Sequence, residues 1–262
     1  MAGQPVTLIT GASAGIGAAL ARVFAERGHS LVLIANRSAQ LDAVADQIAA
    51  AGAMRPHVLP LDLLRADAAT RIEHELRERG LEAQYIVNSA GFGLLGRAAG
   101  LDRAEQLAMI DLNMRVLTDL SLRFLAGLER HRGGVLNVAS VLGFLPGPGM
   151  AVYHATKAYV ISFSQALHHE LAPRGVRVTA LCPGPVDTEF TVRADGFFSR
   201  RLTRSVERVA REGYAGLMQG RRLVVPGRAN KILSVLPRLL PRRYVLSMVG
   251  ASKRRMHRTD AK

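Results

Sequence analysis

Short apolar runs alternate with longer amphipathic segments along most of the chain. The apolar runs are rich in Val, Ile and Leu, as expected of strands that are buried on both faces. We expect strands at Val6–Thr10, Ser30–Ala35, His57–Leu61, Tyr85–Asn88, Val135–Ala139, Arg177–Leu181 and Arg221–Val225. The segments between them have helical length, and we expect helices at Ile16–Arg27, Ala39–Ala50, Ala66–Arg79, Arg103–Leu128 and Tyr153–Leu171.

Regular alternation of strand and helix predicts a doubly wound parallel α/β sheet, a Rossmann fold, because each parallel crossover needs a helix. We expect one domain over residues 1–227, in which 185–220 form a substrate-covering loop or helix pair. Residues 228–262 form an arginine-rich tail that Pro237 and Pro241 interrupt.

Composition narrows the class of protein. A hydrophobic content of 48% suffices for a substantial core, and the single cysteine, Cys182, excludes an intramolecular disulfide and a cysteine-based metal cluster. We expect no bound metal. The first residues do not resemble a signal peptide, and no apolar run reaches the length of a membrane-spanning helix. A cytoplasmic enzyme is therefore the expectation.

The positive charge is concentrated at one end of the chain. The net charge is +14, and residues 190–262 hold 18 Lys and Arg against 4 Asp and Glu. Two interpretations of the tail 228–262 remain open: a peripheral contact with an anionic membrane, or a helix packed on its own domain or on a neighbouring subunit. The second is favoured because Pro237 and Pro241 interrupt a long amphipathic helix. We expect no nucleic-acid partner, since no recognition motif accompanies the charge.

The first strand leads into a glycine-rich turn with the spacing G-x-x-x-G-x-G, at Gly11, Gly15 and Gly17. Such a turn before a helix lets backbone N–H groups face a pyrophosphate. The same residues also fit the G-x-S-x-G elbow of α/β-hydrolases, with Ser13 as nucleophile. That alternative is disfavoured because one strand alone precedes the turn, and His168 and His169 lie in the middle of a helix.

The end of the second strand indicates which dinucleotide binds. NAD-binding proteins usually place an acidic residue there, but this chain has Asn36 and Arg37. A guanidinium suits a 2′-phosphate, so NADP(H) is expected over NAD(H). Asp62, after the third strand, can accept a hydrogen bond from an adenine amine or cap a helix, and the small residues around Ala90 and Gly91 permit a ligand to approach closely.

Tyr153 and Lys157 lie four residues apart on one predicted helix face. An ammonium beside a phenol, together with an oxidised nicotinamide, favours phenolate and lowers its pKa, which makes Tyr153 a usable acid or base. Ser140 follows the fifth strand and can donate a hydrogen bond to a carbonyl oxygen that gains negative charge.

In this combination and order the sequence resembles the short-chain dehydrogenase/reductase family over about residues 5–190. The motifs are the glycine turn from Thr10, Asn88-Ser89-Ala90-Gly91, Ser140, Tyr153, Lys157 and Pro183-Gly184. The resemblance implies that Tyr153 transfers the proton, that Lys157 orients the nicotinamide ribose, that Ser140 positions the substrate, and that Asn113 joins a proton relay by holding a water. It also implies a homo-oligomer, a dimer or tetramer. Ser89 and Ala14 depart from common family residues without touching the reacting atoms.

The expected reaction is hydride transfer between NADP(H) and a carbonyl or secondary alcohol. The expected cofactor-binding residues are Thr10, Gly11, Ser13, Gly15, Ile16, Gly17, Asn36, Arg37, Asp62, Leu63, Asn88, Ala90, Gly91, Tyr153, Lys157, Pro183, Gly184, Val186 and Thr188. The residues expected to line the substrate pocket are all uncharged, which predicts an apolar ketone, acyl or sterol-like substrate. They are Phe92, Leu142, Phe144, Leu145, Met150, Phe190, Phe197 and Phe198. A non-catalytic dinucleotide sensor is the alternative, and the intact acid–base pair argues against it.

Overall fold

A computed structural model of the chain describes residues 3–186, 204–241 and 243–247. Seven parallel strands form one sheet in the order β3-β2-β1-β4-β5-β6-β7. The strands are β1 (Gln4–Thr10), β2 (Leu31–Ala35), β3 (His57–Pro60), β4 (Leu81–Asn88), β5 (Gly134–Val138), β6 (Arg177–Leu181) and β7 (Leu223–Val224). The predicted parallel α/β fold is confirmed, and the strand ends differ from the predicted ones by a few residues.

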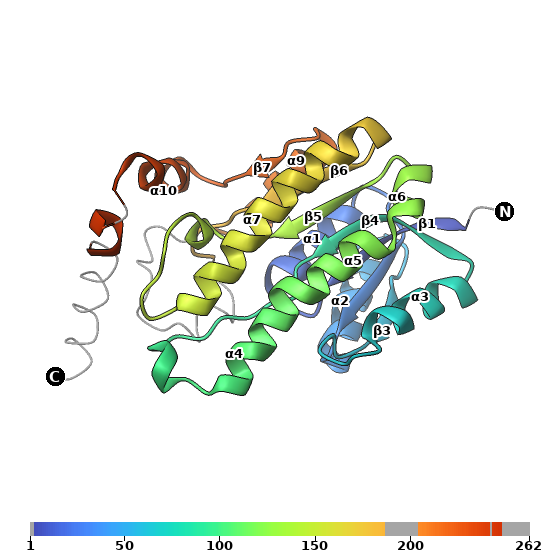
Figure 1. The fold of residues 1–262 in the computed structure, drawn as a ribbon. Helices are drawn as coiled ribbons and strands as arrows, with labels where there is room; N and C mark the ends of the chain where they lie inside the picture. Colours follow the sequence, from blue (N-terminus) through green and yellow to red (C-terminus); the bar gives the residue numbers. More distant parts are fainter. Residues whose placement is uncertain (1–2, 187–203, 242, 248–262) are drawn as a thin grey trace.

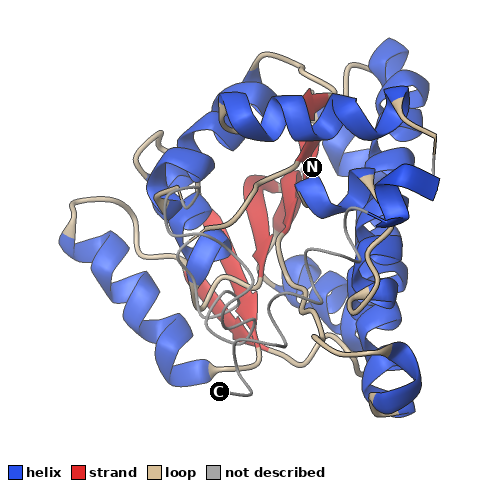
Figure 2. Ribbon diagram, turned by 90° about the vertical axis from the view of Figure 1, so that its left-hand side faces the viewer, coloured by secondary structure: helices blue, strands red, loops and turns tan. Residues whose placement is uncertain are grey.

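Helices cover both faces of the sheet (Figures 1 and 2). They are α1 (Gly15–Ala25), α2 (Ser38–Ala50), α3 (Ala68–Glu78), α4 (Arg103–Ile110), α5 (Leu117–Arg123), α6 (Leu125–Arg130), α7 (Ala151–Leu171), α9 (Val206–Met218) and α10 (Arg228–Leu239). No helix in the described ranges is both long enough and apolar enough to span a membrane.

Alternate residues of each strand enter different cores. In β2, Leu31 and Leu33 pack with α1, α2 and α9, whereas Val32 and Ile34 pack with α3, α5 and α7 on the opposite face. A strand that buries both faces needs apolar side chains at every position, which is why the sequence shows continuous apolar runs.

One predicted helix is interrupted. Instead of running without a break over Arg103–Leu128, the chain forms α4, a π-helical turn at Asp111–Val116, α5 and, after Phe124, α6. A π turn holds one extra residue, which changes the direction of the side chains after it. Hydrophobic periodicity does not reveal such a local change.

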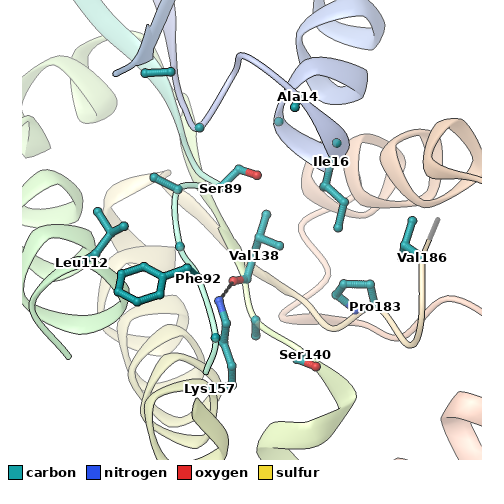
Figure 3. A pocket seen from close by; sticks show the side chains of 18 of the residues that line it. Ala14, Ile16, Ser89, Phe92, Leu112, Val138, Ser140, Lys157, Pro183 and Val186 are labelled. Carbon is teal, nitrogen blue, oxygen red and sulfur yellow. Dashed lines mark hydrogen bonds between the residues drawn. The ribbon is translucent and has the colours of Figure 1, made fainter. Parts of the chain in front are cut away.

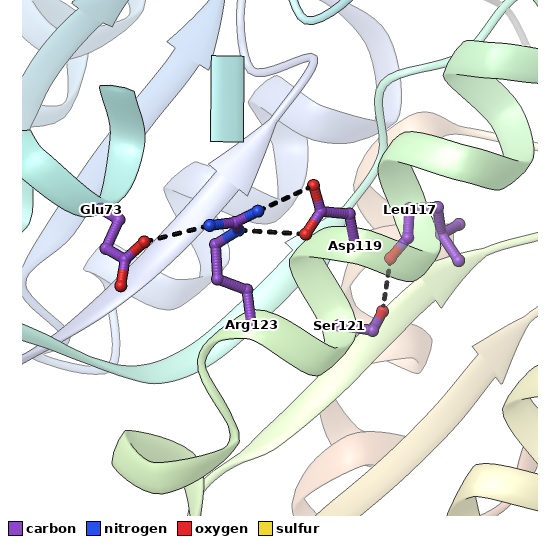
Figure 4. A network of polar contacts seen from close by, with 5 residues as sticks. All are labelled: Glu73, Leu117, Asp119, Ser121 and Arg123. Atoms are coloured by element: carbon purple, nitrogen blue, oxygen red, sulfur yellow. Dashed lines mark hydrogen bonds and ion pairs between the residues drawn. The ribbon is translucent and has the colours of Figure 1, made fainter. Parts of the chain in front are cut away.

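Ion pairs fasten α5 to α3 on the outer surface. The Arg123 guanidinium lies 3.0 Å from Glu73 of α3 and 3.0 Å from Asp119 of α5 (Figure 4). Arg123 also donates a second hydrogen bond to Asp119, at 3.2 Å. These exposed contacts contribute little individually, about 0–1 kcal/mol each.

The C-terminal part differs from its prediction. Residues 206–218, inside the segment expected to cover the substrate, form α9, which buries Val209, Ala210 and Leu217 in the core beside α1. Pro237 does not end α10, which continues to Leu239. The helix ends where Leu240 adopts an extended conformation before Pro241, as proline requires of the residue that precedes it.

Candidate functional site

A cavity of about 470 Å³ opens at the carboxyl ends of the strands. Its wall comes from the loops after β1 to β6 and from α7, around the point between β1 and β4 where the strand order reverses (Figure 3). Ligands of open α/β sheets bind at this position. Of the predicted site residues, the structure places in this wall Gly11, Ser13, Gly15, Ile16, Gly17, Asn36, Arg37, Asp62, Leu63, Ala90, Gly91, Ser140, Tyr153, Lys157, Pro183, Gly184 and Val186.

Further wall residues were not singled out as binding residues from the sequence. They are Ala14, Ala35, Leu61, Ser89, Gly93, Leu112, Val138, Ala139, Val141 and Pro185. Most are small or apolar and immediately follow or precede a predicted residue, so their position at a strand end is the one signal that could have found them. Thr188 lies outside the described residues.

The glycine turn has a backbone that side chains would obstruct. Gly11 and Gly15 adopt left-handed φ angles of 65° and 54°. A Cβ on Gly17 would lie 2.2 Å from the Gly11 carbonyl oxygen, so this close approach of helix to loop requires glycine. No side chain caps α1, which leaves the N–H groups of its first turn available to an anion in the cavity. The turn therefore fits a pyrophosphate.

Thr10 supports the cavity from behind, because it is buried and absent from the wall. Its hydroxyl donates to the Val87 carbonyl at 3.3 Å and accepts from the N–H groups of Ser89 and Ala90, both at 3.1 Å. The end of β1 is thereby tied to the end of β4, and the two loops that face the ligand keep a fixed separation.

Asn88 is also buried behind the wall. Its Nδ2 donates to Asn137 Oδ1 at 2.8 Å and to Ser121 Oγ at 3.0 Å, while Asn137 donates to Ser164 Oγ at 2.9 Å. This chain of buried polar groups links β4, β5, α5 and α7. Asn88 thus braces neighbouring strands and lies behind the wall rather than in it.

The corner of the cavity beyond β2 is cationic. The Arg37 guanidinium donates to Ser13 Oγ at 3.3 Å, so the second strand and the glycine turn share one polar contact. Asn36 is exposed beside it, without an acidic residue at that strand end. Asp62 accepts from the Leu64 N–H at 3.0 Å and does not cap α3, which begins at Ala68.

Ser140, Tyr153 and Lys157 meet at the inner end of the cavity. Ser140 follows β5, accepts from the Leu142 N–H at 3.2 Å, and hydrogen-bonds to the Tyr153 phenol. On α7, the Tyr153 and Lys157 side chains are both buried. The ammonium of Lys157 lies 5.7 Å from the centre of the Tyr153 ring. It donates to the Val138 carbonyl at 2.8 Å (Figure 3).

Burial controls the ionisation of this pair. It raises the pKa of Tyr153, against the opposing effect of the Ser140 hydrogen bond, and it lowers the pKa of Lys157 to about 8. The expectation that Lys157 and an oxidised nicotinamide together lower the phenol pKa stays a prediction, and among the protein groups alone burial is the larger effect on Tyr153. Tyr153 is held as a neutral phenol, a form suited to donating a proton.

Asn113 lies in the π-helical turn, outside the cavity wall. Its Oδ1 accepts from the Phe92 N–H at 3.2 Å, and its Nδ2 donates to the Phe92 carbonyl at 3.0 Å and to Thr156 Oγ1 at 3.1 Å. A Cβ on Gly91 would lie 2.7 Å from Asn113 Oδ1 and 3.6 Å from Lys157 Nζ. Asn113 therefore sits beside Lys157 and fixes the Phe92 backbone, and its part in a proton relay stays a prediction.

Three of the apolar residues expected to contact substrate do not line the cavity. Phe92 and Leu142 do, together with Leu112. Met150 instead packs in a core with Met109 and Tyr153, and Leu145 is buried away from the wall. Phe144 packs against another core. The other three residues expected to contact substrate, Phe190, Phe197 and Phe198, lie outside the described residues.

The hydrolase alternative finds no support in the wall. Ser13 is paired with Arg37, and no histidine in the described part of the chain lines the cavity. A serine nucleophile needs a base within hydrogen-bond reach. Among the described residues no cluster of His, Cys, Asp and Glu could hold a metal ion.

Comparison with known proteins gives concordant matches. The family model for short chain dehydrogenases matches residues 5–195. Sulfoacetaldehyde reductase 2 of Chromohalobacter salexigens is 37% identical over 194 residues, 73% of this chain and 76% of that reductase.

Two solved structures have a similar fold. A short-chain dehydrogenase from Sphingobium yanoikuyae in complex with NADPH superposes with a TM-score of 0.76 at 32% identity, covering 97% of this chain and 95% of that one. A bulky-bulky ketone specific alcohol dehydrogenase from Comamonas testosteroni gives 0.76 at 28% identity, with 94% of each chain covered.

Proposed function

The chain belongs to the short-chain dehydrogenase family and is an NAD(P)-dependent oxidoreductase acting on alcohol or carbonyl groups, and from this premise we propose its substrate and cofactor. The proposed reaction is the reduction of an apolar ketone, acyl or sterol-like carbonyl by NADPH, or its reverse. The observation that carries the proposal is the cavity itself, with Arg37 at one end and Ser140, Tyr153 and Lys157 at the other.

The residues present fit a dinucleotide. The glycine turn and the uncapped first turn of α1 suit the pyrophosphate, and Pro183 and Gly184 lie beside the acid–base cluster, where a nicotinamide would be held. NADPH supplies the hydride when it is bound. The protein supplies position and the proton.

Each member of the cluster has a distinct task. Tyr153 donates its phenolic proton to the carbonyl oxygen of the substrate as the carbonyl carbon is reduced. Ser140 donates a hydrogen bond to the same oxygen and stabilises the charge that develops on it. Lys157 supplies a buried positive charge, which favours the transient phenolate once the proton has left.

NADPH preference rests on the Arg37 corner. A guanidinium held at Ser13 can form charge-assisted hydrogen bonds to a 2′-phosphate, and no carboxylate stands at the end of β2 to repel it. The Sphingobium structure was solved with NADPH, which agrees with this proposal.

The proposed substrate class rests on the apolar part of the cavity wall. Phe92, Leu112 and Leu142 line the cavity near the cluster and offer no charge to a charged substrate. The Comamonas relative is named as specific for bulky ketones, in keeping with an apolar carbonyl here.

A homo-oligomer is also proposed. Leu107 and Ile110 of α4 and Leu122 of α5 are exposed, and a second copy of the chain would cover them. Sedimentation velocity would measure the assembly, and a monomer at micromolar concentration would reject it.

The deciding experiment is a panel assay. NADPH and NADH consumption would be measured against bulky aryl and alkyl ketones, β-ketoacyl thioesters, ketosteroids and small charged aldehydes. The proposal predicts highest kcat/KM for an uncharged ketone or acyl substrate with NADPH. Turnover restricted to charged aldehydes, or a clear preference for NADH, would reject it.

A further inference from the structure

The helix α10 is packed with its polar side inward. Asn230 and Ser234, one turn apart, are each only 7% exposed. Asn230 donates to the Pro226 carbonyl at 2.7 Å and fills the space above Gly184, where a Cβ would lie 2.5 Å from its amide. Ser234 donates to the Lys231 carbonyl at 2.7 Å. Both hydrogen bonds lie within residues 226–234, and the helix packs with this polar side against Gly184 and the turn at Val141–Phe144 of its own domain.

The opposite side of α10 is apolar and exposed. Ile232 is 65% exposed, Val235 52% and Leu236 41%. At about 100° per residue these three positions lie across the helix from Asn230 and Ser234. A surface helix of a globular protein normally has the reverse arrangement, with apolar residues towards the core. Figure 1 shows α10 at the margin of the molecule, apart from the helices that cover the sheet.

The exposed apolar surface continues beyond α10. Residues 243–247 form a further helical turn, in which Val245 is buried and anchors the segment while Tyr244 and Leu246 are about half exposed. We call the exposed side chains of Ile232, Leu233, Val235, Leu236, Tyr244 and Leu246 the α10 surface.

Positive charge surrounds the α10 surface. Arg228, Lys231 and Arg243 are exposed within the same stretch. Residues 228–262 as a whole hold ten Lys and Arg and one acidic residue, Asp260. A second copy of this chain would bring the same positive charge to the contact, and the repulsion disfavours a symmetric interface here. A polyanion such as DNA would satisfy the charge and leave the aliphatic side chains in water.

An anionic bilayer satisfies both properties at once. Aliphatic side chains enter the boundary between headgroups and acyl chains, tyrosine prefers the same depth, and lysine and arginine contact the phosphates. We propose that the α10 surface docks peripherally on a bilayer that contains anionic phospholipid. The proposal does not depend on the proposed substrate or cofactor. The buried side of α10, opposite the docking side chains, packs beside Gly184, a residue of the cavity wall.

The test uses the full-length chain and vesicle flotation. Vesicles of phosphatidylcholine alone are compared with vesicles that also contain phosphatidylglycerol, each at low and high salt. We expect binding to the mixed vesicles, at least tenfold weaker binding to phosphatidylcholine alone, and weakening of the mixed-vesicle binding by salt.

Two variants separate the apolar and charged contributions. The triple variant Ile232→Ser, Val235→Ser and Leu236→Ser should lose at least tenfold in vesicle affinity, as should Arg228→Gln with Lys231→Gln and Arg243→Gln. The control is Met54→Ser, which removes a 66% exposed apolar side chain between α2 and β3 and should bind like the parent. Thermal unfolding and dinucleotide binding confirm that each variant is folded.

Specific outcomes overturn the proposal. One is failure of the parent chain to float with mixed vesicles at low salt. Another is parental affinity in the folded triple serine variant. A third is a triple serine variant that changes from oligomer to monomer while the parent binds no lipid, which would assign the α10 surface to a second copy of the chain.

Discussion

Lys157 donates a hydrogen bond from its ammonium to the main-chain carbonyl of Val138, 2.8 Å away at the carboxyl end of β5. This contact holds a buried cation directly beneath the loop that carries Ser140. One partner does not replace the hydration of an ammonium, which is why burial lowers the pKa of Lys157 to about 8.

Stability should therefore depend on pH through this side chain. The pKa of Lys157 is about 8 in the folded protein, against the ordinary lysine value of 10.5 in an unfolded chain. Below pH 8 both states carry the proton, and the folded state bears the full cost of burying the charge. Between the two pKa values the unfolded state binds more protons, so stability rises with pH, by about 3 kcal/mol in all.

The comparison that isolates this effect is Lys157→Met. Urea unfolding would be measured for the parent and the variant at pH 7 and pH 10. Between these two pH values the free energy of unfolding of the parent should rise by about 2–3 kcal/mol relative to that of the variant. Lys231→Met, at an exposed position, serves as the control and should follow the parent. Parallel pH profiles for parent and Lys157→Met would contradict the predicted burial of charge.

Removal of the Tyr153 hydroxyl should abolish the proposed proton transfer. We expect Tyr153→Phe to lower kcat by about 10²–10⁴-fold, the range that positioned acid–base groups contribute, with the dinucleotide dissociation constant within about threefold. The control is Tyr159→Phe on the same helix, whose hydroxyl bonds to Thr118 at 2.8 Å away from the cavity. Full activity in Tyr153→Phe on every accepted substrate would reject the assignment.

Loss of the Arg37 guanidinium should change cofactor preference. Charge-assisted hydrogen bonds contribute about 1.5–3 kcal/mol, so Arg37→Ala should reduce kcat/KM with NADPH by about 10–100-fold and leave kcat/KM with NADH nearly unchanged. Arg65→Ala provides the control, since Arg65 is exposed and pairs with Asp67. An equal fall with both cofactors would mean that Arg37 does not contact the 2′-phosphate.

Gly17 should tolerate no side chain. A Cβ there would meet the Gly11 carbonyl oxygen at 2.2 Å, so Gly17→Ala should push α1 from the glycine turn. We expect a loss of about 1–3 kcal/mol in the free energy of unfolding and at least tenfold weaker dinucleotide binding. Gly100→Ala, where a Cβ meets nothing within 4 Å, should change neither quantity. Unaltered binding by Gly17→Ala would contradict the tight approach.

The sheet and much of the cavity could be predicted from the sequence for a physical reason. Parallel strands buried on both faces leave continuous apolar runs, and their carboxyl ends meet at one edge, so residues such as Arg37 and Ser140 could be placed together from their positions just after two strands. The glycine spacing located the turn because Gly11 adopts a left-handed φ and Gly17 leaves no room for a Cβ beside the Gly11 carbonyl oxygen.

Other features depend on tertiary contacts that periodicity does not contain. The π-helical turn at Asn113 is accompanied by hydrogen bonds to Phe92 and Thr156 across the fold. Met150 resembled a pocket residue and is packed against Tyr153 in a core. Burial, which raises the pKa of the Tyr153 phenol, could not be predicted because depth of burial is not visible in a sequence, whereas a neighbouring charge is.

The brace between Thr10 and the end of β4 has a consequence for folding. Thr10 belongs to the first βα unit, and Ser89 and Ala90 come from a part of the chain nearly eighty positions later. The cavity forms between the loops after β1 and β4, so it needs this long-range hydrogen bonding, and neither of the two segments contains the cavity alone. A dinucleotide would thus bind the folded chain, in which these slowly formed long-range contacts are complete, and not the unfolded chain. The folded fraction would therefore rise with dinucleotide concentration.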